Sequence, residues 1–150
     1  MALSRDELER RVTALREACR RSGIKLTHQR VEIFREVARS EEHPDVETIF
    51  RRVRKRLTTI SLNTVYSNLQ LLEKLGLLSR LESLCHRVRF DANTDAHHHF
   101  ICSRCGSIRD FYSQEMDELR VPKEARSLGQ VRSFHLLVRG ICSKCRSNRD

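Results

Sequence analysis

The sequence predicts an α+β fold in which a helical N-terminal part is followed by a small unit of mixed helices and strands. Three observations predict it. Up to about Leu75 the apolar residues recur every three or four positions, which is the period of an amphipathic helix. Beyond Gly76 short stretches alternate between apolar and polar residues, which is typical of strands. Four of the seven histidines and four of the six cysteines lie after position 90, so the two parts also differ in chemistry.

The first two helices are predicted from apolar stripes and end signals. Residues 5–22 carry one stripe, and Gly23 is placed to end that helix. Thr27 is placed to cap a second helix. The predicted buried residues of these two helices are Leu8, Val12, Leu15, Ala18, Cys19, Val31, Ile33, Phe34 and Val37. Because Cys19 falls on the stripe, we interpret it as a core residue.

A third helix is expected from about Asp45 to Leu57, after a break at His43-Pro44. Its predicted inward residues are Val46, Ile49, Phe50, Val53 and Leu57. Its outer face is basic and holds Arg51, Arg52, Arg54, Lys55 and Arg56. A solvated helix surface explains this run at least as well as contact with DNA does. His43 lies in a loop outside any stripe, which is by itself typical of a surface histidine.

A fourth helix is predicted from Leu62 to Leu75, capped by Ser61 and closed by Gly76. Its predicted apolar stripe is Leu62, Val65, Leu69, Leu72 and Leu75. The opposite face carries small hydrogen-bonding groups and little charge: Asn63, Thr64, Tyr66, Ser67, Asn68 and Gln70. Such a face suits contacts with base edges and phosphates in a major groove.

Two short strands, 77–81 and 86–90, follow around a turn at Ser83–Cys85. Helices followed by a β-hairpin describe a winged helix-turn-helix, whose arginines Arg80, Arg87 and Arg89 are candidates for phosphate contacts. Residues 1–90 contain 19 Lys+Arg and 12 Asp+Glu, a net charge of +7, whereas residues 91–150 contain 10 and 8, a net of +2. We therefore expect a DNA-binding domain over 1–90, with an ordinary basic surface as the alternative.

Residues 91–150 are expected to form a small α/β domain. The predicted elements are strands at 98–102, 107–112 and 131–138, a helix at 114–119 and a further helical turn at 123–128. So small a core is marginal by itself, which makes self-association an expectation.

Two Cys-x-x-Cys pairs predict a metal site in this domain. Cys102 and Cys105 form one pair, and Cys142 and Cys145 form the other. Each pair puts two thiolates on one tight turn, and two such turns give the closed tetrahedral site that a structural Zn²⁺ prefers. Unliganded thiols are the alternative. A closed four-sulfur site leaves no open position for catalysis.

The histidines indicate a different site. On a strand, His97 and His99 share one face and His98 points the other way. With Asp91 and Asp110 on neighbouring strands or their ends, the nitrogen and oxygen ligands suit Fe²⁺, Mn²⁺ or Zn²⁺. Surface histidines and ordinary aspartates are the alternative.

A third imidazole ligand for this site is missing from the histidine-rich stretch. It would have to come from the DNA-binding part, where His43 and His86 are available.

The chain has no apolar run near the roughly 20 residues of a membrane span and no signal-peptide core at its start. We therefore expect a cytoplasmic protein that is not bound to a membrane. In a reducing compartment paired cysteines indicate metal sites rather than disulfides.

Taken together, the motifs resemble the ferric uptake regulator family across almost the whole chain. They are Leu26-Thr-His-Gln-Arg30, His43-Pro44, Ser61-Leu-Asn-Thr-Val-Tyr-Ser-Asn-Leu69, Gly76-Leu77, the histidine-rich stretch, Cys102-x-x-Cys105-Gly106, Asp110-Phe111 and Cys142-x-x-Cys145. The resemblance implies a homodimeric, metal-responsive transcription factor. It would bind double-stranded operator DNA through a winged helix and dimerise through its C-terminal domain.

The resemblance also implies a ligand set and a mechanism. The family's regulatory site falls on His43, Asp91, His97, His99 and Asp110. A metal held by residues of both domains would fix the angle between them, so that two recognition helices match adjacent half-sites. Without metal, DNA affinity would fall. The residues we expect to contact DNA are Asn63, Thr64, Tyr66, Ser67, Asn68 and Arg80.

The aspartates at positions 91 and 110 bear on the subfamily. Peroxide-sensing repressors resemble this chain in having aspartate at both, where iron-uptake regulators usually have glutamates. In that subfamily bound Fe²⁺ reacts with H₂O₂ and oxidises the histidines matching His43 or His97, which releases DNA, whereas Mn²⁺ permits DNA binding without oxidation. The resemblance therefore favours a peroxide sensor.

Two alternatives are weighed against the peroxide sensor. An iron- or zinc-uptake regulator on the same fold would release DNA on metal depletion instead. A zinc-dependent enzyme could use His97, His99 and Asp110 around an open metal position, but no general base is evident. Steep salt dependence of duplex binding would distinguish a repressor from an enzyme of small substrates.

Two departures from the family stand out. Its other metal site would draw on positions that are here Ala96, His98, Asp117 and Phe134, and we expect that site to be degraded. The wing turn has no glycine, and Cys85 within it is a candidate for an exposed, redox-active thiol.

Overall fold

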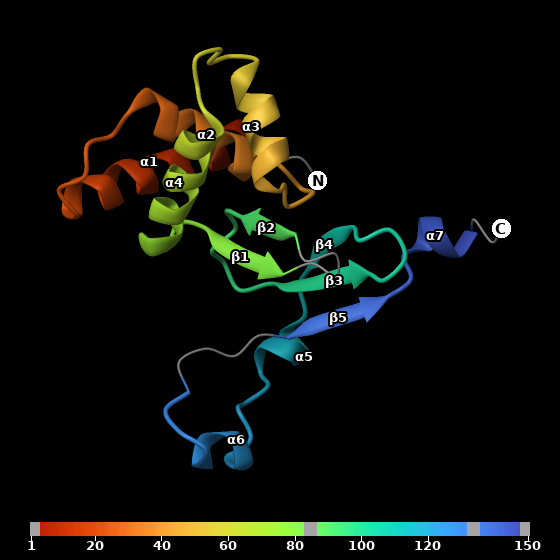
Figure 1. Cartoon of the computed structure of the whole chain (residues 1–150). Coiled ribbons are helices and arrows are strands. Elements are labelled where there is room, and N and C mark those ends of the chain that lie inside the picture. Colours follow the sequence, from red (N-terminus) through yellow and green to blue (C-terminus); the bar gives the residue numbers. More distant parts are fainter. Residues whose placement is uncertain (1–3, 83–86, 132–135, 148–150) are drawn as a thin grey trace. The chain divides into compact units, whose positions relative to one another are not determined.

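Four helices and a two-stranded antiparallel sheet make up the N-terminal unit (Figure 1). The computed structural model describes residues 4–82, 87–131 and 136–147 and divides into units Met1–Thr94 and Asp95–Asp150. The elements of the first unit are α1 (Arg5–Arg21), α2 (His28–Ala38), α3 (Val46–Arg54), α4 (Leu62–Lys74), β1 (Ser79–Glu82) and β2 (Val88–Asp91). The predicted α+β fold class is confirmed, with a winged helix-turn-helix followed by a small α/β unit.

Each of these four helices begins at a side-chain cap. The side-chain oxygens of Ser4, Thr27, Asp45 and Ser61 each accept a hydrogen bond from the backbone N–H three residues further on. Such caps satisfy N–H groups that have no partner within the helix. The predicted caps at Thr27 and Ser61 are therefore confirmed.

The core of the unit is formed by the apolar stripes of the four helices. Its fully buried members include Leu15, Ile33, Ile49, Val65 and Leu69. Two predictions are wrong in detail. Leu62 is exposed, because the first turn of α4 extends beyond the core, and α3 ends at Arg54 rather than at Leu57.

Glycines end the first and fourth helices as predicted. Gly23 and Gly76 have φ of 63° and 71°, and each directly follows the C-cap residue of its helix. Because that left-handed conformation carries no steric penalty for glycine, it lets the chain turn away from the helix axis. After Gly76 the chain enters the wing, where Ser79 pairs with Asp91 and Glu82 with Val88. The predicted wing turn at 83–86, including Cys85 and His86, lies outside the described residues.

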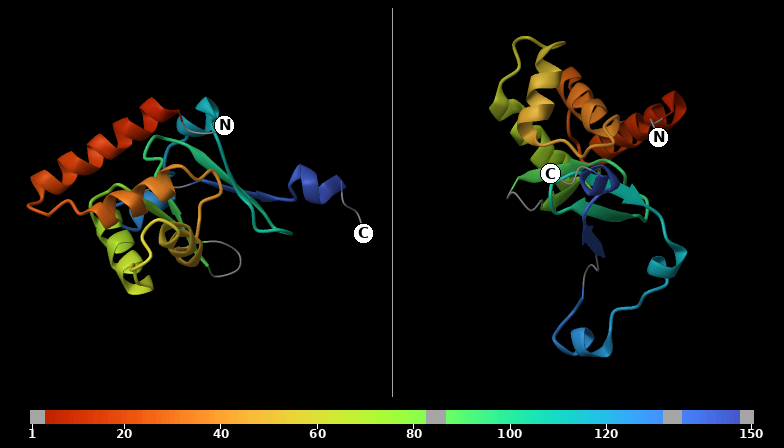
Figure 2. Two further views of the ribbon diagram at one scale, coloured as in Figure 1. Left: turned by 90° about the horizontal axis from the view of Figure 1, so that it is seen from above. Right: turned by 90° about the vertical axis from the view of Figure 1, so that its right-hand side faces the viewer.

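A three-stranded sheet of order β4-β3-β5 forms the C-terminal unit. The elements are β3 (His98–Cys102), β4 (Ile108–Phe111), α5 (Gln114–Asp117), α6 (Lys123–Ser127), β5 (Leu137–Gly140) and α7 (Ser143–Ser147). β3 is antiparallel to β4 and parallel to β5, and the long connection between β4 and β5 carries α5 and α6 (Figure 2).

The two predicted strands around the first cysteine pair are confirmed, and α7 was not predicted. β5 begins at Leu137, later than predicted, and residues 132–135 of the predicted strand lie outside the described residues. Of the helices that the structure describes, none has the length and apolarity to cross a bilayer.

Candidate metal centres and DNA-facing surface

Four cysteines of the C-terminal unit converge. The sulfurs of Cys102, Cys105, Cys142 and Cys145 lie within 4.8 Å of one another. Parallel pairing of β3 with β5 sets Cys102 opposite Gly140, so that each strand delivers one Cys-x-x-Cys pair to the same end of the sheet. The geometry therefore brings together all four predicted thiols.

Hydrogen bonds distinguish the thiols. The backbone N–H groups of Cys142 and Cys105 point at the Cys102 sulfur and lower its pKa to about 6; the Cys142 nitrogen lies 3.3 Å away. Hydrogen bonding with Ser107 lowers the pKa of Cys105. The neighbouring Cys105 and Cys142 sulfurs raise the pKa of Cys145 to about 12. Thiolates gathered this closely repel one another unless a cation lies among them, and four sulfurs fit Zn²⁺.

The same unit contributes three nitrogen and oxygen ligands. The Nε2 atoms of His97 and His99 lie 3.0 Å apart, and Asp110 Oδ1 is 3.5 Å from His99 Nε2 and 3.9 Å from His97 Nε2. His99 and Asp110 are cross-strand partners, so strand pairing positions them. We call these three residues the C-terminal half-site.

His98 points to the other side of β3, as the alternation predicts. Its Nε2 lies 3.0 Å from Asp117 Oδ1, and its ring is 5.5 Å from the ring of Phe111. Of the four positions of the family's other metal site, His98 and Asp117 thus contact each other directly, and Phe134 lies outside the described residues.

The N-terminal unit places one imidazole beside one carboxylate. His43 Nε2 is 3.7 Å from Asp91 Oδ2, and the two side chains are only 2% and 5% exposed. The interpretation of His43 as a surface histidine is therefore wrong. Its loop lies against β2, where the Phe90 N–H donates to the Pro44 carbonyl at 3.1 Å. We call His43 and Asp91 the N-terminal half-site.

The chemistry of these two half-sites fits a divalent ion. Within each half-site the ligating atoms lie within 4.8 Å of one another. The C-terminal half-site offers two imidazole nitrogens and a carboxylate, and the N-terminal half-site offers one of each; ligands of these kinds suit Fe²⁺, Mn²⁺ or Zn²⁺ rather than a soft metal.

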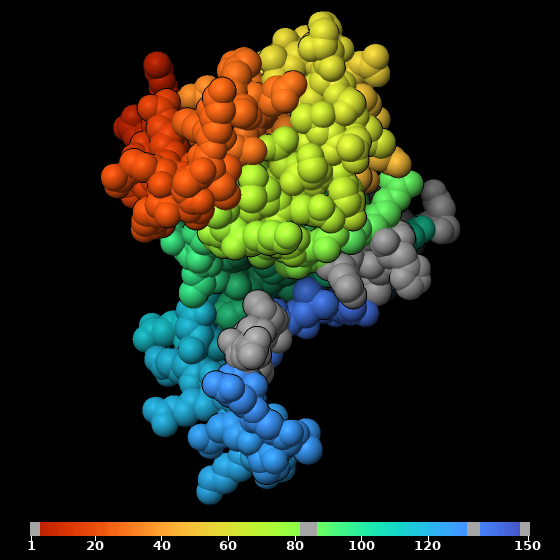
Figure 3. Space-filling view, turned by 60° about the vertical axis from the view of Figure 1, so that its left-hand side comes forward, coloured from red at the N-terminus to blue at the C-terminus, as the bar shows by residue number. Residues whose placement is uncertain are grey.

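The exposed face of α4 carries most of the residues expected to contact DNA. Asn63, Tyr66 and Ser67 are exposed and Thr64 is half-buried. Figure 3 shows the yellow-green part of the chain, which includes α4, at the surface of the N-terminal unit. Placing Asn68 on this face is wrong: only 9% of it is exposed. Arg80 on β1 is partly exposed, 3.6 Å from Glu73.

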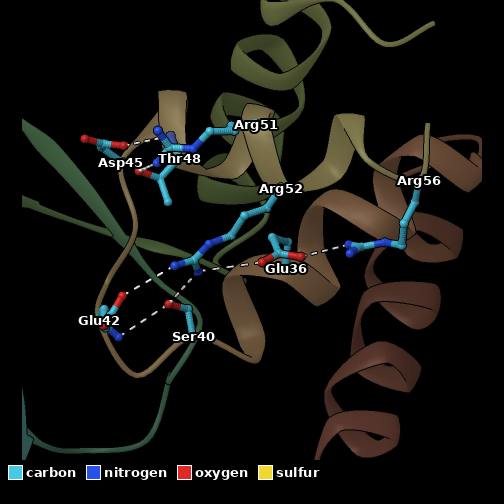
Figure 4. A network of polar contacts seen from close by, with 8 residues as sticks. All are labelled: Glu36, Ser40, Glu42, Asp45, Thr48, Arg51, Arg52 and Arg56. Carbon is cyan, nitrogen blue, oxygen red and sulfur yellow. Dashed lines mark hydrogen bonds and ion pairs between the residues drawn. The ribbon is translucent and has the colours of Figure 1, made fainter. Parts of the chain in front are cut away.

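Two arginines of the basic stretch from Arg51 to Arg56 form ion pairs with glutamates. Arg52 contacts Glu36 at 3.7 Å and Glu42 at 3.4 Å, and Arg56 contacts Glu36 at 2.8 Å (Figure 4). Arg56 also contacts Glu32 at 2.9 Å. These two arginines therefore connect α3 and the turn after it to α2 and the loop that follows α2. Ion pairs of this kind agree with a structural surface of the helix, the alternative to contact with DNA. The remaining basic side chains of the run, Arg51, Arg54 and Lys55, are exposed.

Burial and ion pairs act in opposite directions on Glu32 in this network. Partial burial raises its pKa, but the hydrogen bonds and charges of Arg56 and Arg35 outweigh that effect and leave the pKa below its ordinary value. Sequence reasoning missed this network. The signal was present as Glu32 and Glu36, one turn apart on α2.

Comparison with known proteins finds relatives of this chain by sequence and by structure. The sequence model of the ferric uptake regulator family matches residues 21–136. The peroxide-responsive repressor PerR of Staphylococcus epidermidis is 31% identical over 140 residues, which cover 93% of this chain and 91% of that protein.

Solved structures agree with the sequence matches. The ferric uptake regulator Fur of Helicobacter pylori, described with three functional metal-binding sites, aligns with a TM-score of 0.77 at 25% identity over 100% of this chain and 99% of its own. A zinc-bound manganese uptake regulator aligns with a TM-score of 0.66 at 32% identity, covering 86% and 98%.

Proposed function

This chain belongs to the ferric uptake regulator family, and we propose that within the family it is a repressor that senses hydrogen peroxide. The chain is a metal-dependent transcription regulator, as the family is. The proposal adds the signal to which the regulator responds. Its relatives in the comparison are named as repressors and uptake regulators rather than as enzymes.

One observation carries the proposal: the carboxylate of each half-site is an aspartate. Asp91 lies beside His43, and Asp110 lies beside His97 and His99. Aspartate at both positions is the pattern of the peroxide-sensing subfamily that the sequence resembles. The 31% identity to a peroxide-responsive repressor supports the same assignment.

We assign the five half-site residues to one Fe²⁺ or Mn²⁺ ion. The ligand chemistry and the family resemblance support this assignment. With metal bound, ligands from both units would hold the recognition helices of the dimer at the spacing of the two halves of the operator DNA. The zinc bound by Cys102, Cys105, Cys142 and Cys145 would remain in place throughout, because a closed site exchanges poorly.

Ferrous iron, when bound, supplies the electrons that cleave hydrogen peroxide, a reaction that Mn²⁺ does not support. His43 and His97 are the proposed sites of oxygen addition. An oxidised ring binds metal less well, so DNA would be released. The burial of His43 confines the reaction to an oxidant generated at the ring rather than in bulk solvent.

A homodimer belongs to the proposal as well. The C-terminal sheet leaves an apolar cavity of about 490 Å³ between Phe100, Phe111, Met116 and Val138. Leu137 and Ile141 nearby in sequence are exposed. Exposed apolar side chains beside such a cavity on so small a unit support association with a second copy.

The test compares Fe²⁺-loaded and Mn²⁺-loaded protein after exposure to H₂O₂. We expect the iron-loaded protein to lose duplex binding and to gain one oxygen atom on a peptide containing His43 or His97, whereas the manganese-loaded protein changes in neither respect. His97→Gln should abolish metal-dependent binding. His98→Gln, on the other side of β3, is the matched control and should retain it.

An unchanged peptide mass in iron-loaded protein would contradict peroxide sensing. It would leave the second candidate, an iron- or zinc-uptake regulator, which the structural similarity to the Helicobacter pylori Fur favours. That regulator would release DNA when the metal is removed, with or without peroxide.

A further inference from the structure

The segment from His43 to Asp45 lies against the wing strand β2 like a short third strand. The Phe90 N–H donates to the Pro44 carbonyl at 3.1 Å, and Asp45 forms an antiparallel bridge with Arg89. Arg89 Nη1 donates to the His43 carbonyl at 3.3 Å. The segment that carries the His43 imidazole is therefore held to the wing by backbone pairing at Pro44 and Asp45 and by the Arg89 side chain at the His43 carbonyl.

Asp45 extends these contacts to the DNA-facing side of the unit. One carboxylate oxygen accepts from the Thr48 N–H at 2.8 Å and caps α3. The other lies 3.3 Å from Nη1 of Arg87 on the wing. The Asp45 side chain is 11% exposed, whereas that of Arg87 is 64% exposed. A buried carboxylate thus orients an arginine whose side chain lies largely in solvent.

A cavity of about 220 Å³ lies beside this ion pair. Asp45, Tyr66, Arg80 and Arg87 are among its lining residues. Tyr66 and Arg80 are among the residues that we expect to contact DNA. Asp45 therefore shares a cavity wall with Tyr66 of α4 and with Arg80 and Arg87, two of the three wing arginines that are candidates for phosphate contacts.

We infer that Asp45 is a positioning residue that transmits metal occupancy at His43 to Arg87 of the wing. The inference rests on the proposed function and adds a route that lies within one N-terminal unit. His43 has a left-handed backbone conformation, with φ of 49°, which non-glycine residues adopt at a cost. Holding the ring on a metal restricts this segment. Asp45 is then restricted as well, and Arg87 is pre-oriented for a backbone phosphate of DNA.

Asp45→Asn separates this role from simple folding. Asparagine caps a helix as well as aspartate does, so the hydrogen bond from Thr48 is retained while the charge that orients Arg87 is removed. The experiment uses full-length, zinc-containing protein and a duplex selected by the Mn²⁺-loaded wild type from a random library. It measures Mn²⁺ affinity, and it measures duplex affinity with and without Mn²⁺.

We expect Asp45→Asn to bind Mn²⁺ within about twofold of wild type, since Asp45 is not among the proposed ligands. The gain in duplex affinity on adding Mn²⁺ should fall on the order of fivefold. In an Arg87→Gln background, Asp45→Asn should cause no further loss of that gain, because the two residues act in series. Arg80→Gln is the matched control, and it should lower duplex affinity by the same factor with and without Mn²⁺.

If adding Mn²⁺ raised the duplex affinity of Asp45→Asn as much as that of wild type, the inference would be overturned. Additive losses of duplex affinity in the double variant would also overturn it. So would a loss of Mn²⁺ affinity in Asp45→Asn that accounts for its whole loss of duplex affinity. A wild type whose duplex affinity is unaffected by Mn²⁺ would instead overturn the proposed function, so the two failures are distinguishable.

Discussion

Asn68 connects α4 to the start of α2. Its Nδ2 donates to the Thr64 carbonyl at 2.8 Å, and its Oδ1 accepts from Arg30 Nε at 3.0 Å. Arg30 also donates to the Lys25 carbonyl. Because the amide is buried and both of its ends are bonded within the protein, its role is to orient α4 rather than to read bases.

Replacing Asn68 by alanine should therefore lower stability. The change leaves the Arg30 Nε without its acceptor and opens a small void, at a cost of about 1–2 kcal/mol in the free energy of unfolding. Asn63→Ala, on the exposed face of the same helix, is the control and should change it by less than about 0.5 kcal/mol. Denaturant unfolding of both variants measures the difference, and equal stabilities would refute the assignment.

At the scale of elements, charge pairs hold α2 against α3. Glu36 is 9% exposed and contacts Arg56 at 2.8 Å and Arg52 at 3.7 Å. Hydrogen bonding to Glu36 raises the pKa of Arg56, so this guanidinium stays charged. A buried carboxylate without such partners would lower the stability of the fold. Arg52 and Arg56, the two arginines that pair with Glu36, are therefore required by the structure of the helical bundle.

This network predicts a pH dependence of stability. The pKa of Glu32 is lowered by folding, so its contribution to stability is complete above the ordinary pKa of a glutamate and is lost as the pH falls through the lowered pKa. Arg56→Gln removes the main cause. It should reduce stability by about 1 kcal/mol at neutral pH and flatten the loss of stability in acid.

Unfolding by urea between neutral and acidic pH measures this effect. Lys55→Gln is the control, since Lys55 is exposed at the neighbouring position. If Arg56→Gln and Lys55→Gln lost stability in parallel as the pH falls, the network would not be the source of the pH dependence.

At the scale of the whole molecule, the two units differ in what holds them together. The helices of the N-terminal unit share a continuous apolar core. The buried apolar residues of the C-terminal unit are few in the described part of the chain: Ile101, Cys102, Ile108 and Cys142. Two of the four are thiols of the proposed zinc site, so much of that unit's stability should come from metal coordination.

Removing zinc should therefore unfold the units unequally. Cys145→Ser should lose tightly bound zinc, and amides of β3 and β5 should lose protection from hydrogen exchange, while α1–α4 remain protected. Cys19→Ala removes a thiol of the N-terminal core and should leave zinc content unchanged. Equal loss of protection in both units of Cys145→Ser would show that the zinc site stabilises the chain globally.

Local patterns in the sequence sufficed for the four N-terminal helices, for the caps at Thr27 and Ser61 and for the two Cys-x-x-Cys pairs. Thr27 and Ser61 act on the N–H three residues away, and each Cys-x-x-Cys pair lies within one turn. The alternation that separates His97 and His99 from His98 likewise depends only on the period of a strand. Such features are readable because the interacting groups are neighbours along the chain.

Only the tertiary structure decided which polar residues are turned inward. His43 is buried in a segment whose Pro44 and Asp45 pair with a strand more than 40 residues later, and its own carbonyl accepts from Arg89, 46 positions away. Asn68 is buried rather than on the exposed face of α4, and its side-chain oxygen accepts a hydrogen bond from Arg30, 38 positions earlier. A periodic pattern records which residues face a common side. It does not record which distant segment will cover a polar side chain, since burial is a property of the packed chain and not of the local sequence.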